Sequence, residues 1–277
     1  MTQIDIGLTL RRAYHNALQA LAAQIEQIRS TELRDVDLNQ LQIVRNQIVL
    51  DENGNPGPVL PFFSPYPEVS VPTEELDLFI RRAFPEYGLY RTESIVRKIY
   101  DYFGEYLSWC EHSVRQSRKP LWTTKGLYDY DYKKLFGIES CSECSIIHVS
   151  DVPGVQYPHL RCMMLNNINH DNDNLLRSEL LAITTYMYKR LESNEFDEHV
   201  LAPVILISFM GSQQARILQA HFDGDSLIVG YTKLYNLKKE DNATLNVLVR
   251  WGLCYPTGIT TCSRGITLPF RNSGRAY

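Results

Sequence analysis

The sequence predicts an α+β protein, with a helical N-terminal part followed by a C-terminal unit of alternating helices and strands. Apolar residues recur at spacings of three and four over residues 4–30, which is the period of an amphipathic helix. Residues 200–234 instead contain three apolar runs separated by turn signals, as expected for strands. The composition, 44% apolar and 22% charged over 277 residues, is that of an ordinary globular protein.

The N-terminal part is expected to consist of one helix and a proline-rich loop. The helix over residues 4–30 is followed by a strong turn cluster at Asp51–Pro58, and five prolines lie within residues 58–72. Each proline fixes φ and removes a backbone donor, so we expect an extended loop or linker here. The chain is therefore divided into residues 1–72 and a main α+β domain, residues 73–277.

The main domain is expected to begin with two helices. Thr73 offers its side-chain oxygen as the N-cap of a helix that extends to about Phe84. A longer amphipathic helix is expected over residues 92–117. Residues 122–132 alternate tyrosine with aspartate in their second half, which indicates a short strand or a surface loop.

The C-terminal half has the clearest pattern. A buried strand is followed by two strands joined at Asp223-Gly224, a hairpin turn signal. Helices are predicted before and after these three strands, and one more strand follows. The resulting α-β-β-β-α-β core unit, about residues 174–270, has its elements at residues 174–192, 200–210, 215–222, 226–234, 240–252 and 259–268.

This order of elements resembles the core of the PD-(D/E)xK nuclease-like fold. The resemblance implies a divalent metal, held by carboxylates, that activates water. It assigns Glu179 to the first helix, Asp223 to the hairpin and Lys233 to the third strand. The residue two positions before Lys233 is Tyr231, where those enzymes have an acidic residue, so the pattern lacks one metal ligand. A divergent metal-dependent nuclease-like enzyme is therefore one functional hypothesis, and an inactive relative is another.

Four residues have the spacing of a zinc site. Cys141 and Cys144 form a C-x2-C pair, and His159 with Cys162 forms an H-x2-C pair after 14 intervening residues. Each pair offers two adjacent corners of a tetrahedron, which predicts a structural zinc and a zinc-stabilised binding module. The alternative is that both pairs lie on core strands that happen to carry thiols, because the neighbouring residues are apolar.

Charge and targeting signals restrict the partners. The chain has 28 Lys and Arg against 32 Asp and Glu, without the basic excess of a nucleic-acid-binding protein, so we do not expect nucleic acid as a partner. We recognise no signal peptide and no apolar run of membrane-spanning length, so we expect a cytoplasmic protein that does not bind membranes. Its cysteines are then expected to be reduced. Phosphate-loop, dinucleotide-binding, nucleophile-elbow and kinase motifs do not occur.

Two stretches of the chain are similar to uncharacterised proteins of filamentous fungi. The first contains Tyr100–Gly104 and Lys119–Trp122, and the second contains Ala202–Gly211, Phe222–Gly224 and Thr232–Tyr235. The resemblance covers about half of the chain and implies no activity and no site residue, although some such proteins are encoded in specialised-metabolite gene clusters. Since the sequence contains no complete catalytic set, we expect a non-catalytic intracellular accessory or interaction protein. A protein partner is favoured, and fungal specialised metabolism is the expected context.

Overall fold

The computed structural model describes residues 3–58, 60–67, 84–86, 92–115, 122–125, 144–170 and 173–262, and it confirms an α+β fold. The α-helices are α1 (Gln3–Glu26), α2 (Asp35–Gln40), α4 (Thr92–Arg115), α6 (Arg177–Glu192) and α7 (Asn242–Gly252). The main sheet contains β2 (Ile43–Gln47), β4 (Thr123–Lys125), β5 (Cys144–Asp151), β6 (Leu160–Asn166), β8 (Val204–Met210), β9 (Gln214–Phe222), β10 (Leu227–Tyr231) and β11 (Tyr235–Asn236). The remaining short elements are β1 (Glu32–Leu33), β3 (Phe63–Ser64), β7 (Leu175–Leu176), β12 (Tyr255–Pro256) and the 3₁₀ turn η1 (Asn194–Phe196).

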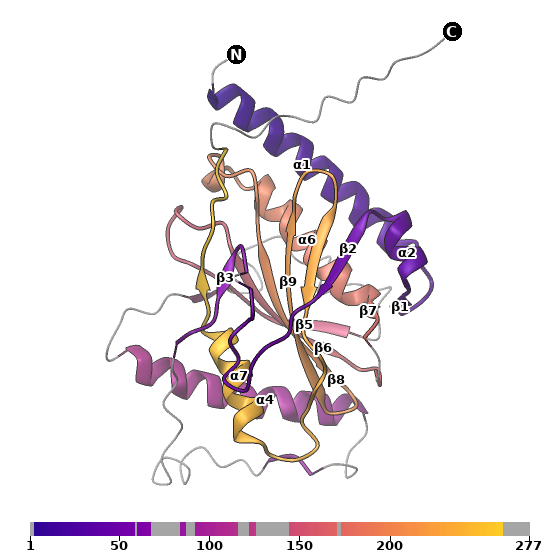
Figure 1. Ribbon diagram of the computed structural model, residues 1–277, viewed down its shortest axis with the longest axis vertical. Coiled ribbons are helices and arrows are strands. Elements are labelled where there is room, and N and C mark those ends of the chain that lie inside the picture. Colours follow the sequence, from indigo (N-terminus) through magenta and orange to yellow (C-terminus); the bar gives the residue numbers. More distant parts are fainter. Residues whose placement is uncertain are drawn as a thin grey trace.

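The main sheet is mixed. Its strands follow the order β2-β10-β9-β8-β6-β5-β4, and β11 pairs with one end of β9 (Figure 1). The pairs β2–β10 and β6–β8 are parallel, and the other neighbours are antiparallel. The chain passes from β6 to β8 through α6, which supplies the crossover that parallel neighbours require.

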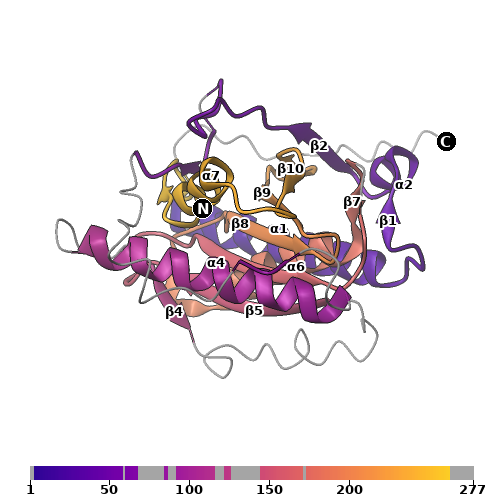
Figure 2. The ribbon, with the colours of Figure 1, turned by 90° about the horizontal axis from the view of Figure 1, so that it is seen from below.

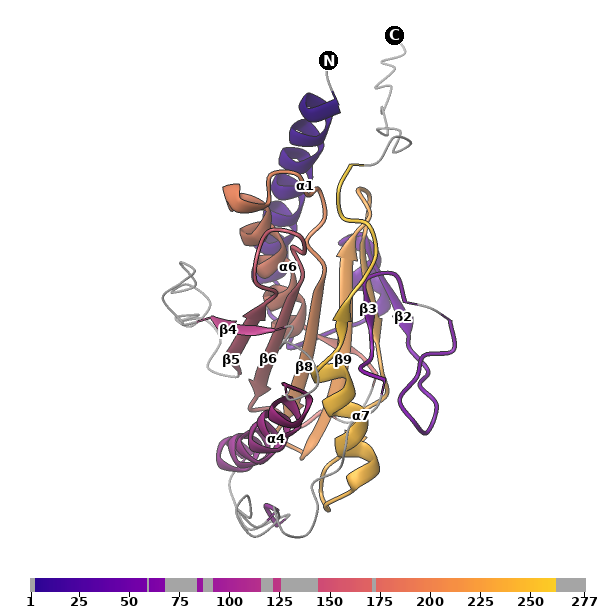
Figure 3. The same cartoon turned by 90° about the vertical axis from the view of Figure 1, so that its left-hand side faces the viewer.

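Helices cover both faces of the sheet. On one face lie α1 and α6, and on the other lie α4 and α7 (Figure 2, Figure 3). Successive residues of a strand point to opposite faces. Leu206 of β8 therefore belongs to the core under α1 and α6, whereas Ile207 belongs to the core under α4 and α7. This explains why all residues of β8 are buried, as its continuous apolar run predicted.

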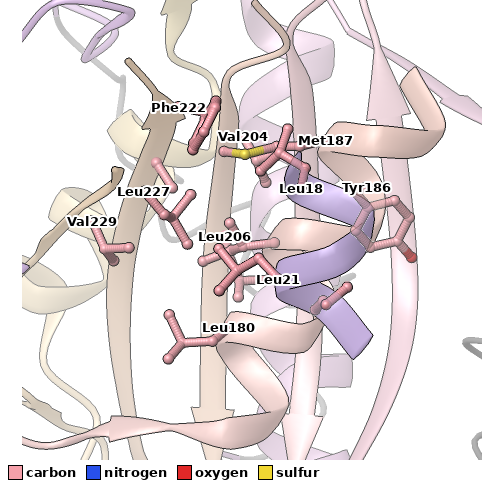
Figure 4. Packing of buried hydrophobic residues seen from close by; sticks show 14 of the residues in the cluster. Leu18, Leu21, Leu180, Tyr186, Met187, Val204, Leu206, Phe222, Leu227 and Val229 are labelled. Carbon is pink, nitrogen blue, oxygen red and sulfur yellow. The ribbon is translucent and has the colours of Figure 1, made fainter. Parts of the chain in front are cut away.

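The core under α1 and α6 shows how the N-terminal helix joins the fold. Leu18 and Leu21 of α1 pack against Met187 of α6, and the strand residues Val204 and Leu206 lie beneath them (Figure 4). In addition, β2 is hydrogen-bonded to β10 at the edge of the main sheet. The N-terminal segment thus contributes to the same sheet and the same core as the C-terminal half.

Most predicted elements that lie within the described residues are confirmed. These include α1, α4, α6, the three strands β8, β9 and β10, and α7. The hairpin turn has Gly224 at φ +108°, a conformation that glycine adopts without strain. Residues 73–83 of the predicted second helix, the predicted boundary at residue 72 and most of the predicted last strand lie outside the described residues.

We find no helix, within the part of the chain that the structure describes, whose length and apolar character would allow it to cross a membrane.

Candidate ligand pocket

The structure places Glu179 in a buried ion pair. Glu179 lies in the first turn of α6 and is fully buried, as is Arg216 of β9. Arg216 Nε donates to Glu179 Oε1 at 2.9 Å, and Arg216 Nη2 donates to Glu179 Oε2. The backbone N–H of Leu176 also donates to Glu179 Oε2 at 3.0 Å, and Arg216 Nη2 donates to the carbonyl oxygen of Asn174 at 2.9 Å. Both carboxylate oxygens therefore fix the N-terminus of α6 on the sheet.

Asp223 of the nuclease-like pattern lies away from this ion pair. Asp223 follows β9, where its Oδ1 accepts from the backbone N–H groups of Asp225 and Ser226 at 2.9 and 2.8 Å. Asp223 is seven residues beyond Arg216 along an extended strand, which separates the two by roughly 23 Å. Lys233 follows β10, with its Nζ 5.7 Å from the ring centre of Tyr235. The structure does not bring Glu179 and Asp223 to a shared position.

The four residues with zinc-site spacing are also separated where the structure describes them. Cys144 opens β5 opposite Asn166, whereas Cys162 lies on β6 opposite Val149, which puts Cys144 five residues away along the strand, or roughly 16 Å. His159 precedes β6 and its Nε2 bonds to the carbonyl oxygen of Thr257 at 3.0 Å. Among the described residues, no three His, Cys, Asp or Glu side chains are placed to hold a metal ion. Cys141 lies outside those residues, and the zinc site stays a prediction.

A pocket of about 260 Å³ lies on the α7-covered face of the sheet. Residues of β2, β9 and β10 form its floor, and Pro58 with residues 60–63 of the proline-rich segment forms its wall. Figure 3 shows β3, which belongs to this segment, between β9 and β2. Most of the lining is apolar and includes Ile48, Val49, Leu60, Phe62, Phe63 and Ile228. Its volume is at the small end for a ligand site, and a mainly apolar lining with a few polar groups is typical of pockets that bind small molecules.

Two polar side chains of β9 lie in this pocket. Gln219 and His221 share one face of the strand because they are two residues apart. The Gln219 side chain is 8% exposed, and its Nε2 is buried with no hydrogen-bond partner. The His221 ring centre lies 4.7 Å from that of Phe62. Burial lowers the pKa of His221, although Asp223 raises it, so the imidazole is neutral at neutral pH.

Two glycines allow close packing at the pocket, one on its floor and one behind its wall. A Cβ on Gly230 of β10 would lie 2.8 Å from Ile48 Cδ1, so a larger residue would displace Ile48. Gly258 has φ +77°, and a Cβ there would lie 2.2 Å from the carbonyl oxygen of Pro61. The wall is further held by β3, which pairs with β12, and by the backbone N–H of Thr257, which donates to the carbonyl oxygen of Phe62 at 2.9 Å. These contacts fix the wall against β12 and the segment that follows it.

Gln219 and His221 belong to no motif that the sequence predicts as a site. The signal that points to them is the alternation within the strand over residues 215–222, where polar residues occupy every second position near the end of a strand with apolar neighbours. The segment that forms the wall was predicted as loop or linker. Its contacts with Gly258 and β12 are between residues almost 200 positions apart, which no local pattern reveals.

In comparisons with protein-family models, with curated proteins and with solved structures, this chain has no match.

Proposed function

We propose that this protein is a non-catalytic binding protein that holds a small, uncharged, mainly apolar molecule between β9, β10 and the proline-rich wall. The observation that carries this proposal is the buried amide of Gln219, whose Nε2 has no partner. A buried donor without an acceptor costs about 1–3 kcal/mol. A ligand carbonyl or hydroxyl oxygen beside Gln219 would remove that cost, and the apolar walls would cover the rest of the ligand.

The lining of the pocket favours an uncharged ligand. The described residues that line it carry no charge at neutral pH, since the only ionisable side chain among them is the neutral His221. A charged group would lose its hydration here without gaining a counter-charge. A specialised metabolite built on an apolar carbon skeleton has the required chemistry, which agrees with the resemblance to proteins from fungal metabolite clusters and with an accessory role.

Filling the pocket is expected to abolish most of the binding. Ile228→Phe adds bulk on the floor of the pocket, so its dissociation constant for the neutral fluorophore N-phenyl-1-naphthylamine should rise at least about tenfold, or about 1.4 kcal/mol. A fluorescence titration measures this. Val36→Phe, at an exposed position of α2 away from the pocket, is the matched control and should bind as the wild type does. Equal binding by a folded Ile228→Phe variant would refute the proposal.

The Gln219 amide is expected to discriminate between ligands. Gln219→Met preserves the length of the side chain but removes its donor. It should weaken the binding of naphthyl ketones by about fivefold, the value of one neutral hydrogen bond, and leave the binding of alkylnaphthalenes unchanged or slightly tighter. Competition with the fluorophore measures both affinities. An equal loss for ketone and hydrocarbon would show that Gln219 does not donate to the ligand.

A further inference from the structure

A second hollow lies on the same face of the sheet and is lined by residues of α4, β4, β5 and β6. Figure 2 shows α4 alongside β4 and β5. Its volume is about 1030 Å³, and none of the described residues that line it also lines the ligand pocket. Arg161 of β6 lies at its base, together with His148 of β5 and Thr124 of β4. We call this hollow the α4 cleft.

Arg161 differs from the other large buried arginines. Arg161, Arg190 and Arg216 are all almost completely buried. Arg190 Nη2 lies 3.1 Å from Asp151 Oδ2, and Arg216 is paired with Glu179. Arg161 instead donates from Nη1 to the carbonyl oxygen of Gly252 and from Nη2 to Ser150 Oγ at 3.0 Å, which are both neutral acceptors.

The guanidinium of Arg161 also keeps a free donor. Its Nε is buried and has no hydrogen-bond partner, and no described carboxylate lies within ion-pair distance of it. The Trp122 ring, whose centre lies 5.4 Å from Arg161 Cζ, is a stabilising neighbour. Burial lowers the pKa of Arg161, and the more distant carboxylate of Glu111 on α4 opposes this in part. Buried charges in proteins are nearly always paired, because removing an ion from water costs several kcal/mol. A buried cation that is bonded only to neutral acceptors at a cleft therefore favours an anionic ligand.

We propose that the α4 cleft binds a small monocarboxylate with an aromatic or alkyl body, and that Arg161 supplies the counter-charge. The free edge of a guanidinium matches the two oxygens of a carboxylate. The Ser150 hydroxyl contacts this guanidinium and lies 2.8 Å from His148 Nε2, which in turn lies 3.1 Å from the Thr124 hydroxyl. The aromatic side chains of Tyr100 and Trp109 line the cleft and offer apolar contact to the rest of the ligand.

The other charged residues of the α4 cleft favour a ligand with a single negative charge. Arg97 lies on α4 and its Nε is bonded to Asp101 Oδ1 at 3.1 Å, so it is already neutralised. Glu105 and Glu111, also on α4, line the same cleft. Their negative charge opposes phosphate dianions and polyanions more strongly than it opposes one carboxylate. The α4 cleft is separate from the pocket proposed for the neutral ligand, so either proposal can fail without the other.

Calorimetric titration with benzoate, with benzamide as the uncharged analogue, tests the carboxylate site in the wild-type protein. Benzoate should bind at least tenfold more tightly than benzamide, and inorganic phosphate should not compete with it. Equal affinity for benzoate and benzamide, or displacement of benzoate by phosphate at equal concentration, would overturn the proposal.

Variants then assign the binding to Arg161. Arg161→Met should weaken benzoate binding at least tenfold. Arg97→Met, which removes a cation from the same cleft, should change it less than threefold. Arg161→Lys retains the charge and should recover part of the affinity, which separates the loss of charge from a folding defect. Unchanged benzoate affinity in a folded Arg161→Met variant would contradict the role of Arg161, and Ile228→Phe should leave benzoate binding intact.

Discussion

Glu179→Ala is expected to destabilise the protein by about 3–5 kcal/mol, because it leaves the Arg216 guanidinium buried without a counter-charge. The pair lies between α6 and β9 and both side chains are fully buried. The guanidinium already has one buried Nη1 without a partner, so little compensation is available after the carboxylate is removed. Urea denaturation followed by circular dichroism measures the free energy of unfolding.

An exposed pair on the same helix provides the matched control. Lys189 and Glu192 lie in the last turns of α6, with Nζ 2.7 Å from Oε2, and both side chains are partly exposed to solvent. Glu192→Ala should therefore cost only about 0–1 kcal/mol. The double variant Glu179→Leu with Arg216→Met replaces both charges by apolar groups and should recover most of the stability lost in Glu179→Ala. A cost below about 1 kcal/mol for Glu179→Ala would mean that water reaches the pair.

Glu179 shows that the order of helices and strands along the chain does not determine which partner a buried carboxylate has. The order of helix, three strands and helix was predictable, because helical spacing, the apolar run of β8 and the Asp223-Gly224 turn are local signals. The resemblance of this order to the nuclease-like fold predicted that Glu179 binds a metal ion. Arg216 carried the contrary signal, since a charged residue within an apolar strand requires a buried partner, but the strand alone does not identify that partner.

The candidate sites depend on contacts between segments that are distant in the chain. Gln219 lies on a predicted strand and does not stand out by its residue type. Arg161 lies on the mainly apolar strand β6, where its charge predicts a buried partner but not which one. Gln219 becomes notable because Pro58 and residues 60–63 line a pocket with it, and Arg161 because its acceptors, Ser150 and Gly252, are neutral. The sheet-edge pairing of β2 with β10 is likewise non-local. Local patterns thus predicted the elements, while burial and pairing across the sheet determined which side chains are unusual.

Lowering the pH from 6.5 to 4 is expected to destabilise the protein through His159. This side chain is fully buried beside Phe63 and Tyr157, with ring-centre distances of 5.2 and 5.9 Å. Burial lowers the pKa of His159 to about 4, and the hydrogen bond to the carbonyl oxygen of Thr257 opposes this shift only in part. The unfolded chain, with a histidine pKa near the ordinary 6.5, therefore binds a proton that the folded protein excludes.

The sign and size of this effect follow from linkage between protonation and folding. Because the unfolded state binds more protons in this window, the free energy of unfolding falls as the pH falls, and the contribution of His159 levels off below about pH 4. The full loss is on the order of 3 kcal/mol. His159→Phe removes the titrating group while keeping an aromatic side chain. At pH 7 the variant should have a free energy of unfolding about 1 kcal/mol below that of the wild type, because it lacks the hydrogen bond to Thr257. Near pH 4 it should be more stable than the wild type. Urea midpoints measured between pH 7 and pH 4 test this, and parallel pH profiles for both proteins would show that the folded state readily protonates His159.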